Sequence, residues 1–272
     1  GGTWREEQSG PAASSTEEED QLFCSRCRRP MREKQRAAGH GSSNRQCPFL
    51  ARLKGYQRTA KEKGVAFSLT DRAAVALMRA PCCLCGEPAP LDGHGITRLR
   101  ISTLTAGPGA MGPYSPENTA TACSICNLAK GFHTRDEFMS LCRHIATHQG
   151  LGDYGRFPEV FANNVSKRSR SCYISDSKTH KLSNAEFNDI VAQPCFYCGK
   201  KSNPPTHYNG LDRLDSSVRV YTQDTCVSCC GTCNVAKYRH SVQVFLDHCK
   251  KVAEYQEQQR ATAGCTIEGQ EG

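Results

Sequence analysis

Paired cysteines are the residues of this chain whose type and spacing could do chemistry. The chain has 272 residues and 18 cysteines, many of them in Cys-x-x-Cys pairs that recur at intervals of about 30–40 residues. Thiolates at this spacing hold zinc in a tetrahedral site. A disulfide framework is the alternative, but it requires an oxidising compartment. The opening GGTWREEQSG lacks the apolar stretch of a signal peptide, so the pattern favours zinc.

The pairs predict two complete zinc sites and one partial site. Each complete site combines two Cys-x-x-Cys pairs, and we expect structural zinc at Cys82, Cys85, Cys123 and Cys126, and at Cys195, Cys198, Cys230 and Cys233. A third zinc would take ligands from a cluster nearer the N-terminus, namely Cys24, Cys27, His40 and Cys47. His40 lies between two glycines, and the alternative is an ordinary loop histidine in a degenerate module.

The two quartets lie in stretches that match at many further positions. The shared motifs are Pro-Cys-x-x-Cys-Gly, Gly-[Ile/Leu]-x-Arg-Leu and Cys-x-x-Cys-Asn-x-x-Lys. They occupy residues 81–86 and 194–199, 95–99 and 210–214, and 123–130 and 230–237. Phe138 matches Phe245 beyond them. Matches at this many spaced positions predict two copies of one zinc-binding unit.

The apolar content indicates small units that depend on metal. Hydrophobic residues make up 38% of the chain and aromatic residues 7%, which is little for a large core. We predict an α+β fold of small zinc-stapled ββα units in tandem, with helical arms and an N-terminal zinc knuckle. The predicted divisions are a disordered acidic tail at 1–20, the cysteine-rich module at 21–50, the first unit at 51–149, a linker at 150–156, the second unit at 157–255 and a disordered tail at 256–272.

Capping residues and apolar periodicity predict the helices. Thr70 is a predicted cap, and Thr134 with Glu137 forms a predicted capping box. Ser183 or Asn184 and then Ser241 are the predicted starts of two later helices. The buried faces are predicted at Phe138, Leu141 and Ile145, and at Phe245, Cys249 and Val252.

The positive charge indicates a polyanionic partner. The net charge is +8, with a dense basic block at residues 24–63. Such a block attracts phosphate backbones, although a solvated basic face is the alternative. The side chains expected to contact nucleic acid are Arg28, Arg29, Arg32, Arg52, Lys54, Arg58, Lys61, Lys63, Lys130, Lys167, Arg168, Arg170 and Lys237.

The second stretch resembles an HNH endonuclease domain of the His-Me finger (ββα-metal) group. The resemblance rests on Cys-x-x-Cys-Gly, on the Leu-Asp-Arg-Leu-Asp segment at 211–215 and on Cys-x-x-Cys-Asn-x-x-Lys. It covers residues 165–255, and residues 52–148 resemble the family more loosely.

The resemblance implies a second, catalytic metal such as Mg²⁺, held between a hairpin and a helix. Asp212 would be the ligand from the hairpin and Asn234 the ligand from the helix. Arg213 stands where the family usually has its base histidine, and because a guanidinium stays protonated, it would clamp the phosphate. His207 or His240 could replace the base, although each is more often an ordinary surface histidine.

Two departures from the family pattern count against cleavage. Thr225 occupies the position of the asparagine that orients the base. The first stretch keeps Asn118 and Asn127 but has Thr97 and Arg100 in place of the two aspartates. Without a hairpin carboxylate it should not hold Mg²⁺, so we predict a non-catalytic copy.

The expected function is nucleic-acid binding by a zinc protein of the HNH-like family, with DNA or RNA as partner. Metal-dependent phosphodiester cleavage could be retained in the second unit only. The alternative is a non-catalytic, structural RNA-binding component of a ribonucleoprotein such as an organellar ribosome. No stretch approaches the ~18 apolar residues of a membrane span. We expect an intracellular protein of the nucleus or an organelle, without a membrane partner.

Overall fold

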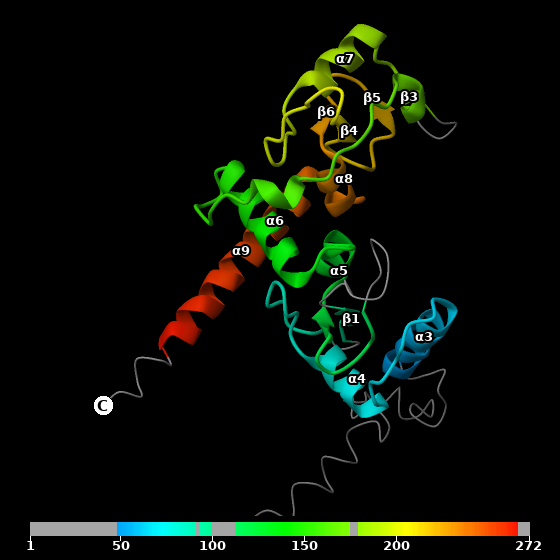
Figure 1. Cartoon of the computed structure of the whole chain (residues 1–272), viewed down its shortest axis with the longest axis vertical. Coiled ribbons are helices and arrows are strands. Elements are labelled where there is room, and N and C mark those ends of the chain that lie inside the picture. The colour runs from blue at the N-terminus through cyan, green and yellow to red at the C-terminus, as the bar shows by residue number, and fades with distance from the viewer. Residues whose placement is uncertain (1–47, 91–92, 99–111, 175–178, 266–272) are drawn as a thin grey trace, which may run out of the picture.

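The described part of the chain is a mixed α/β structure. The computed structural model describes residues 48–90, 93–98, 112–174 and 179–265 (Figure 1), and these contain seven α-helices and three two-stranded sheets. No helix within these ranges is long and apolar enough to span a bilayer. The N-terminal predictions lie outside the described residues: the tail at 1–20, most of the module at 21–50, and with them Cys24, Cys27, His40, Cys47, Arg28, Arg29 and Arg32.

We call residues 48–149 the first region. Two helices open it, a hairpin follows, and two further helices close it (Figure 1). In chain order the elements are α3 (Pro48–Glu62), α4 (Asp71–Arg79), β1 (Gly95–Arg98), β2 (Thr119–Ala122), α5 (Ser124–Lys130) and α6 (Arg135–His148).

We call residues 150–265 the second region. Its order of elements is similar, with short 3₁₀ turns in place of the opening helix. In chain order the elements are η1 (Pro158–Phe161), η2 (Arg170–Tyr173), β3 (Thr179–His180), α7 (Asn184–Ala192), β4 (Gly210–Arg213), β5 (Val220–Tyr221), β6 (Cys226–Cys229), α8 (Gly231–Lys237) and α9 (Val242–Cys265).

Each region contains an antiparallel pair of strands that leads directly into a short helix. β1 pairs with β2 so that Gly95 lies opposite Ala122, and β4 pairs with β6 so that Gly210 lies opposite Cys229. α5 follows β2 and α8 follows β6. The order of strand, strand and helix is therefore the same in the two regions, and so is the register of the strands.

A tyrosine from an earlier segment braces each strand pair. The hydroxyl of Tyr56 accepts a hydrogen bond from the backbone N–H of Ile96 at 3.1 Å, and the hydroxyl of Tyr173 accepts one from Leu211 at 3.2 Å. A Cβ atom at Gly95 would lie 2.8 Å from the Tyr56 hydroxyl. Gly210 faces Tyr173 in the same way, so close approach of a tyrosine explains why both strands begin with glycine.

The predicted helix starts are confirmed by the capping geometry. Thr70 accepts a hydrogen bond from the N–H of Ala73, and Thr134 with Glu137 forms a complete capping box. Ser183 does the same for α7 together with Glu186. At the start of α9, Ser241 accepts from the N–H of Val244. Local side-chain chemistry thus sets where these helices begin.

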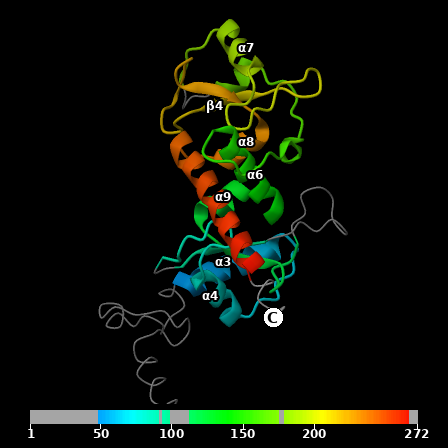
Figure 2. The same cartoon turned by 90° about the vertical axis from the view of Figure 1, so that its left-hand side faces the viewer.

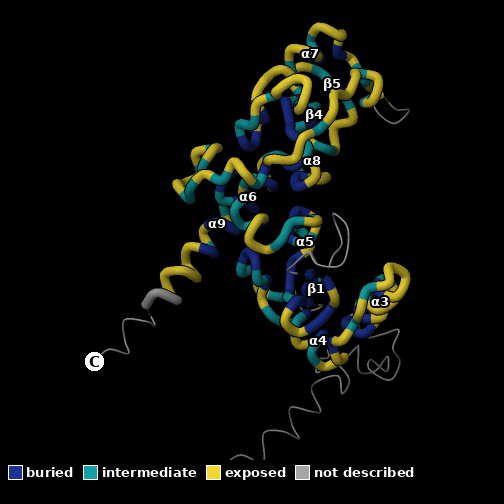
Figure 3. Tube along the Cα trace, viewed as in Figure 1, coloured by how far each residue is buried: buried dark blue, intermediate teal, exposed yellow. Residues whose placement is uncertain are grey.

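Helices α6 and α9 pack against each other at the centre of the molecule (Figure 2). α9 runs from the second region back along α6 towards the first (Figures 1 and 2). The predicted apolar faces are confirmed, because Phe138, Leu141 and Ile145 of α6 and Phe245 and Val252 of α9 are buried. A single buried cluster contains these side chains and the cysteines of both quartets. Dark blue stretches lie along β1, β4 and α8, whereas residues 257–262 of α9 are exposed (Figure 3).

The last part of each long helix closes the cysteine loop of the other region. From α9, Gln256 donates a hydrogen bond to the carbonyl of Leu84 at 3.0 Å. Just after α6, Gln149 donates to the carbonyls of Phe196 and Tyr197. The predicted start of a disordered tail at residue 256 is wrong, because α9 continues to Cys265 and Gln256 is buried.

Candidate metal centres

The described structure brings each complete cysteine quartet together. Within each quartet the four sulfur atoms lie within 4.8 Å of one another, and all eight cysteines are buried. The sulfur atoms of Cys85 and Cys123 are 3.7 Å apart, as are those of Cys198 and Cys230. Four Zn–S bonds of about 2.3 Å in a tetrahedron place the sulfurs about 3.8 Å apart. The spacing therefore fits two structural zinc ions, one in each region.

Tight turns and helix starts position the ligands. Cys82 and Cys195 each begin a turn that is closed by the N–H of a glycine with positive φ, Gly86 or Gly199. The second pair of each quartet lies at a helix start, where the sulfur of the first cysteine accepts the N–H of the second at 3.5 Å. These N–H···S contacts orient thiolates for a metal.

The crowded thiols influence one another strongly. The hydrogen bond from Cys126 holds the pKa of Cys123 far below its usual range, and the hydrogen bond from Cys198 does the same for Cys195. Four buried thiols cannot all ionise without a compensating cation, and zinc supplies that charge. The cysteines of both quartets are free thiols, so the disulfide alternative does not describe them.

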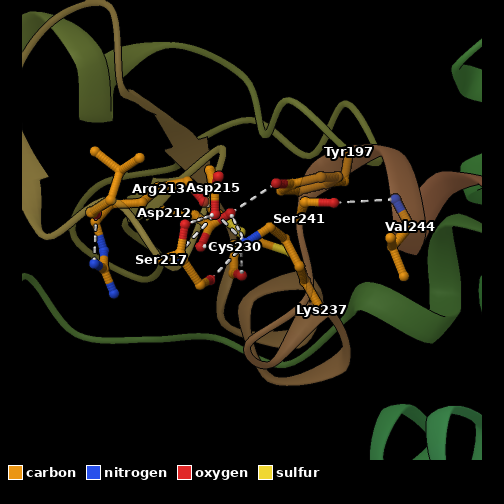
Figure 4. Close-up of polar contacts among 12 residues, drawn as sticks. Tyr197, Asp212, Arg213, Asp215, Ser217, Cys230, Lys237, Ser241 and Val244 are labelled. Carbon is orange, nitrogen blue, oxygen red and sulfur yellow. Dashed lines mark hydrogen bonds and ion pairs between the residues drawn. The ribbon is translucent and has the colours of Figure 1, made fainter.

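Asp212 lies in a buried ion pair beside the second quartet (Figure 4). Its carboxylate accepts a hydrogen bond from the Tyr197 hydroxyl at 2.6 Å and lies 3.1 Å from the ammonium of Lys237. Lys237 also donates to the carbonyl of Arg213 at 2.9 Å and contacts Ser216 at 3.3 Å. Burial, together with the charge of Asp212, raises the pKa of Tyr197. The carboxylate is thus compensated by groups of the protein itself.

Arg213 and Asp215 point to different partners (Figure 4). The guanidinium of Arg213 donates to the carbonyl of Val218 at 2.7 Å and lies over the ring of Tyr221, 5.4 Å from its centre. The carboxylate of Asp215 accepts hydrogen bonds from the N–H and hydroxyl of Ser217, which lower its pKa. These contacts order the turn after β4.

Both ring nitrogens of His207, the candidate base, form hydrogen bonds within the protein. Its Nδ1 accepts the N–H of Val165 at 3.1 Å, so Nε2 carries the proton and donates to the Oδ1 of Asn209 at 3.0 Å. The residue is buried, and desolvation lowers its pKa. Thr225 likewise donates to the carbonyl of Val220 within its own turn. Asn234, in contrast, is exposed on α8.

The basic residues divide into exposed and internal groups. Lys130 donates to the carbonyl of His133, Arg52 to those of Gly93 and His94, and Arg170 to that of Leu182. Lys130 and Lys237 are also fully buried. The expectation that Lys130 and Lys237 contact nucleic acid is therefore corrected, and Arg52 and Arg170 have structural bonds. The exposed members are Lys54, Arg58, Lys61, Lys63, Lys167 and Arg168.

A cavity of about 620 Å³ opens where the two regions meet. Both regions line it, and its wall includes Phe132, His133, Arg168, Tyr208, Asn234 and Val235. Phe132 and Val235 are among the most exposed apolar side chains of the described residues. Sequence reasoning missed this cavity, because its walls come from segments far apart in the chain, and it also missed Tyr197, whose only sequence signal is its place between two ligands.

The fold and the quartets together define a mixed α/β protein with two sites suited to structural zinc. The chain is similar to the uncharacterized protein R423 of Acanthamoeba polyphaga mimivirus, with 31% identity over 202 residues. The match covers 73% of this chain and 36% of the viral protein, so the chain spans about a third of that relative's length. No family model matches the chain, and no solved structure matches it.

Proposed function

We propose that this chain is a zinc-stapled nucleic-acid-binding protein related to HNH endonucleases, built from two copies of one ββα unit. The observation that carries nucleic-acid binding is the exposed basic face of α3. Lys54, Arg58 and Lys61 are exposed and follow the i, i+4, i+7 spacing that places them on one side of the helix. The buried residues Leu53 and Ala60 hold the helix against the first region from another side.

A row of cations on one helix face suits a phosphate backbone. Consecutive positions along the row are one turn apart, about 5–6 Å, and Arg58 forms an exposed pair with Glu62 at 3.8 Å. Such a pair contributes little and is easily exchanged for a phosphate contact. Lys167 and Arg168 are also exposed, in the second region, and Arg168 lines the cavity between the regions. Both regions therefore offer basic side chains to a nucleic acid.

The relation to HNH endonucleases is supported by the corresponding arrangement of the two regions. Both pair strands in the same register before a short helix, and both have a cysteine quartet across that junction. Asp212 lies on the strand and Asn234 on the helix, where the HNH resemblance places its metal ligands. The first region has Thr97 in place of the aspartate. We therefore assign it a role in binding and support.

Direct titration tests nucleic-acid binding. Affinity for duplex DNA and duplex RNA, measured by fluorescence anisotropy between 50 and 200 mM salt, should fall steeply as salt rises, with a slope of about 0.9 per phosphate contact on B-DNA. The double variant Lys54→Gln/Lys61→Gln should reduce that slope by about 2. Arg72→Gln/Arg79→Gln, which removes two exposed charges from α4, is the matched control. Binding that does not depend on salt would contradict the proposal.

Phosphodiester cleavage in the second region is the second candidate function. The observation that favours it is the exposure of Asn234 on the cavity beside the strand that carries Asp212. The ion pair of Asp212 with Lys237 opposes it, because a divalent ion would have to displace the ammonium. Plasmid cleavage in Mg²⁺ or Mn²⁺ that is abolished in Asp212→Asn would support cleavage. Equal activity in both proteins would rule out this site.

The non-catalytic alternative makes a different prediction. A structural component of a ribonucleoprotein would bind structured RNA more tightly than duplex DNA and would cleave neither. The same titrations and the same plasmid assay separate the two candidates.

A further inference from the structure

A histidine from the second region lies against a ligand sulfur of the first quartet. His248 of α9 places its Nε2 atom 3.0 Å from the sulfur of Cys126. The residue is buried, with 8% of its surface exposed. It comes from the helix that follows the second quartet, so the second region delivers an imidazole to the metal site of the first.

The corresponding position of α6 holds a leucine. Phe138 in α6 matches Phe245 in α9, so the position three residues later is Leu141 in α6 and His248 in α9. Leu141 is fully buried and has no polar atom in its side chain. The neighbouring contacts are reciprocal, since Gln149 and Gln256 each close the other region's cysteine loop. The two glutamine contacts are thus alike in the two regions, whereas the residue at the position of His248 differs.

We propose that His248 is an outer-sphere group of the first zinc site, which donates a hydrogen bond from Nε2–H to the Cys126 thiolate and so makes that zinc harder to release. Four sulfurs already complete a tetrahedron. The His248 ring is not part of the group of donor atoms that lie within 4.8 Å of one another. The imidazole thus acts on a ligand and not on the metal itself.

The hydrogen bond stabilises the thiolate in two ways. It offsets part of the negative charge that a Cys₄ site concentrates around one zinc. It also fixes the orientation of the sulfur, as partners of metal ligands generally do. Because the donor lies on α9, retention of the first zinc depends on correct packing of α9 against α6. At the second quartet the histidine contact from α6 is made by His144 to the backbone carbonyl of Cys198 at 3.0 Å, and not to a ligand sulfur.

Exchange of zinc for ¹¹³Cd gives a readout at each site separately. The full-length protein should show two cadmium resonances, whose shifts respond to hydrogen bonds at the ligand sulfurs. His248→Leu should shift one resonance and leave the other in place. Leu141→His, which introduces the donor at the second site, should shift the other resonance. His248→Gln keeps an N–H donor and should restore most of the original shift.

Zinc release to a chromophoric chelator gives the second measurement. His248→Leu should release one of the two zinc ions about tenfold faster, the size expected for loss of a partner to a metal ligand. His248→Gln should release it at close to the original rate. The proposal is overturned if His248→Leu moves both resonances equally, if neither the shifts nor the rates change, or if Gln behaves like Leu.

Discussion

The two regions place a buried lysine at the same point of their short helices but give it different surroundings. In the second region Lys237 pairs with Asp212 at 3.1 Å. In the first region the strand position of Asp212 is occupied by Thr97, and Lys130 donates to the carbonyl of His133 at 2.7 Å. Burial and the nearby charge of Arg98 lower the pKa of Lys130 to about 8. The lysine keeps its structural place when its counter-charge is lost, at a cost to its charged form.

The comparison indicates which parts of the unit are scaffold. The strand register, the tyrosine brace and the quartet are common to both regions. So is an arginine over a tyrosine ring, with Arg98 4.6 Å from the ring centre of Tyr114 and Arg213 5.4 Å from that of Tyr221. On the first strand of each pair the change in charge is at Asp212, which replaces Thr97, so Asp212 is the residue on which a chemical difference between the regions would depend.

Removal of one zinc should give the largest loss of folding stability. It also tests whether each region folds without the other. Because one buried cluster includes both quartets, Cys198→Ser should lower the metal content from two zinc ions to one and also reduce amide-exchange protection in the first region. The loss should be on the order of the ~10 kcal/mol that structural zinc contributes. Metal analysis and hydrogen exchange measure it. Cys172→Ser, at an exposed free thiol, is the control. Unchanged protection in the first region would show that the regions fold separately.

Replacement of the two buried lysines should give the clearest difference in stability loss between the two regions. Lys237→Met leaves the buried carboxylate of Asp212 without its cation, and we expect a loss of about 3–5 kcal/mol. Lys130→Met leaves no carboxylate behind and should cost far less. Urea unfolding of the zinc-loaded proteins measures both, and Asp212→Asn/Lys237→Met should recover part of the loss. Equal destabilisation by the two single variants would contradict the assigned pairing.

The pH dependence of stability should carry the signature of Lys130. Its pKa is lowered to about 8 from 10.5, so between these values the unfolded chain binds more protons than the folded chain. Stability should therefore rise with pH across this window, by an amount on the order of 3 kcal/mol. The difference between wild type and Lys130→Met isolates this contribution from other titrating groups. A difference that falls with rising pH, or stays flat, would show that Lys130 titrates normally.

The tyrosine braces should give the smallest effect and an equal one in the two regions. Tyr56→Phe and Tyr173→Phe each remove one hydrogen bond to a strand N–H, and each should cost about 1 kcal/mol. Tyr238→Phe, at a half-exposed position, should be close to neutral. Markedly unequal losses at Tyr56 and Tyr173 would show that the braces differ in strength.

Local features were predictable from the sequence because they depend on short spacings. Cys-x-x-Cys pairs place two sulfurs on one turn, and the capping residues act within four positions of their partners. The quartets and the caps at Thr70, Thr134 and Ser183 follow from these rules. The same rules could not show that His207 and Lys237 are buried, so the predicted roles of His207 as a base and of Lys237 as a surface cation did not follow from them. Burial decided both, and burial depends on segments that are distant in the chain.

By itself the sequence determined which cysteines form each quartet, where several helices begin and which helix faces are apolar, since these are properties of neighbouring residues. The tertiary structure alone decided that α6 and α9 each pack towards the cysteine loop of the other region. Gln149 and Gln256 therefore each contact the other region's loop, and His248 reaches Cys126. An apolar helix face indicates burial without naming its partner. Which surface covers which quartet is a matter of long-range packing, and no spacing along the chain encodes it.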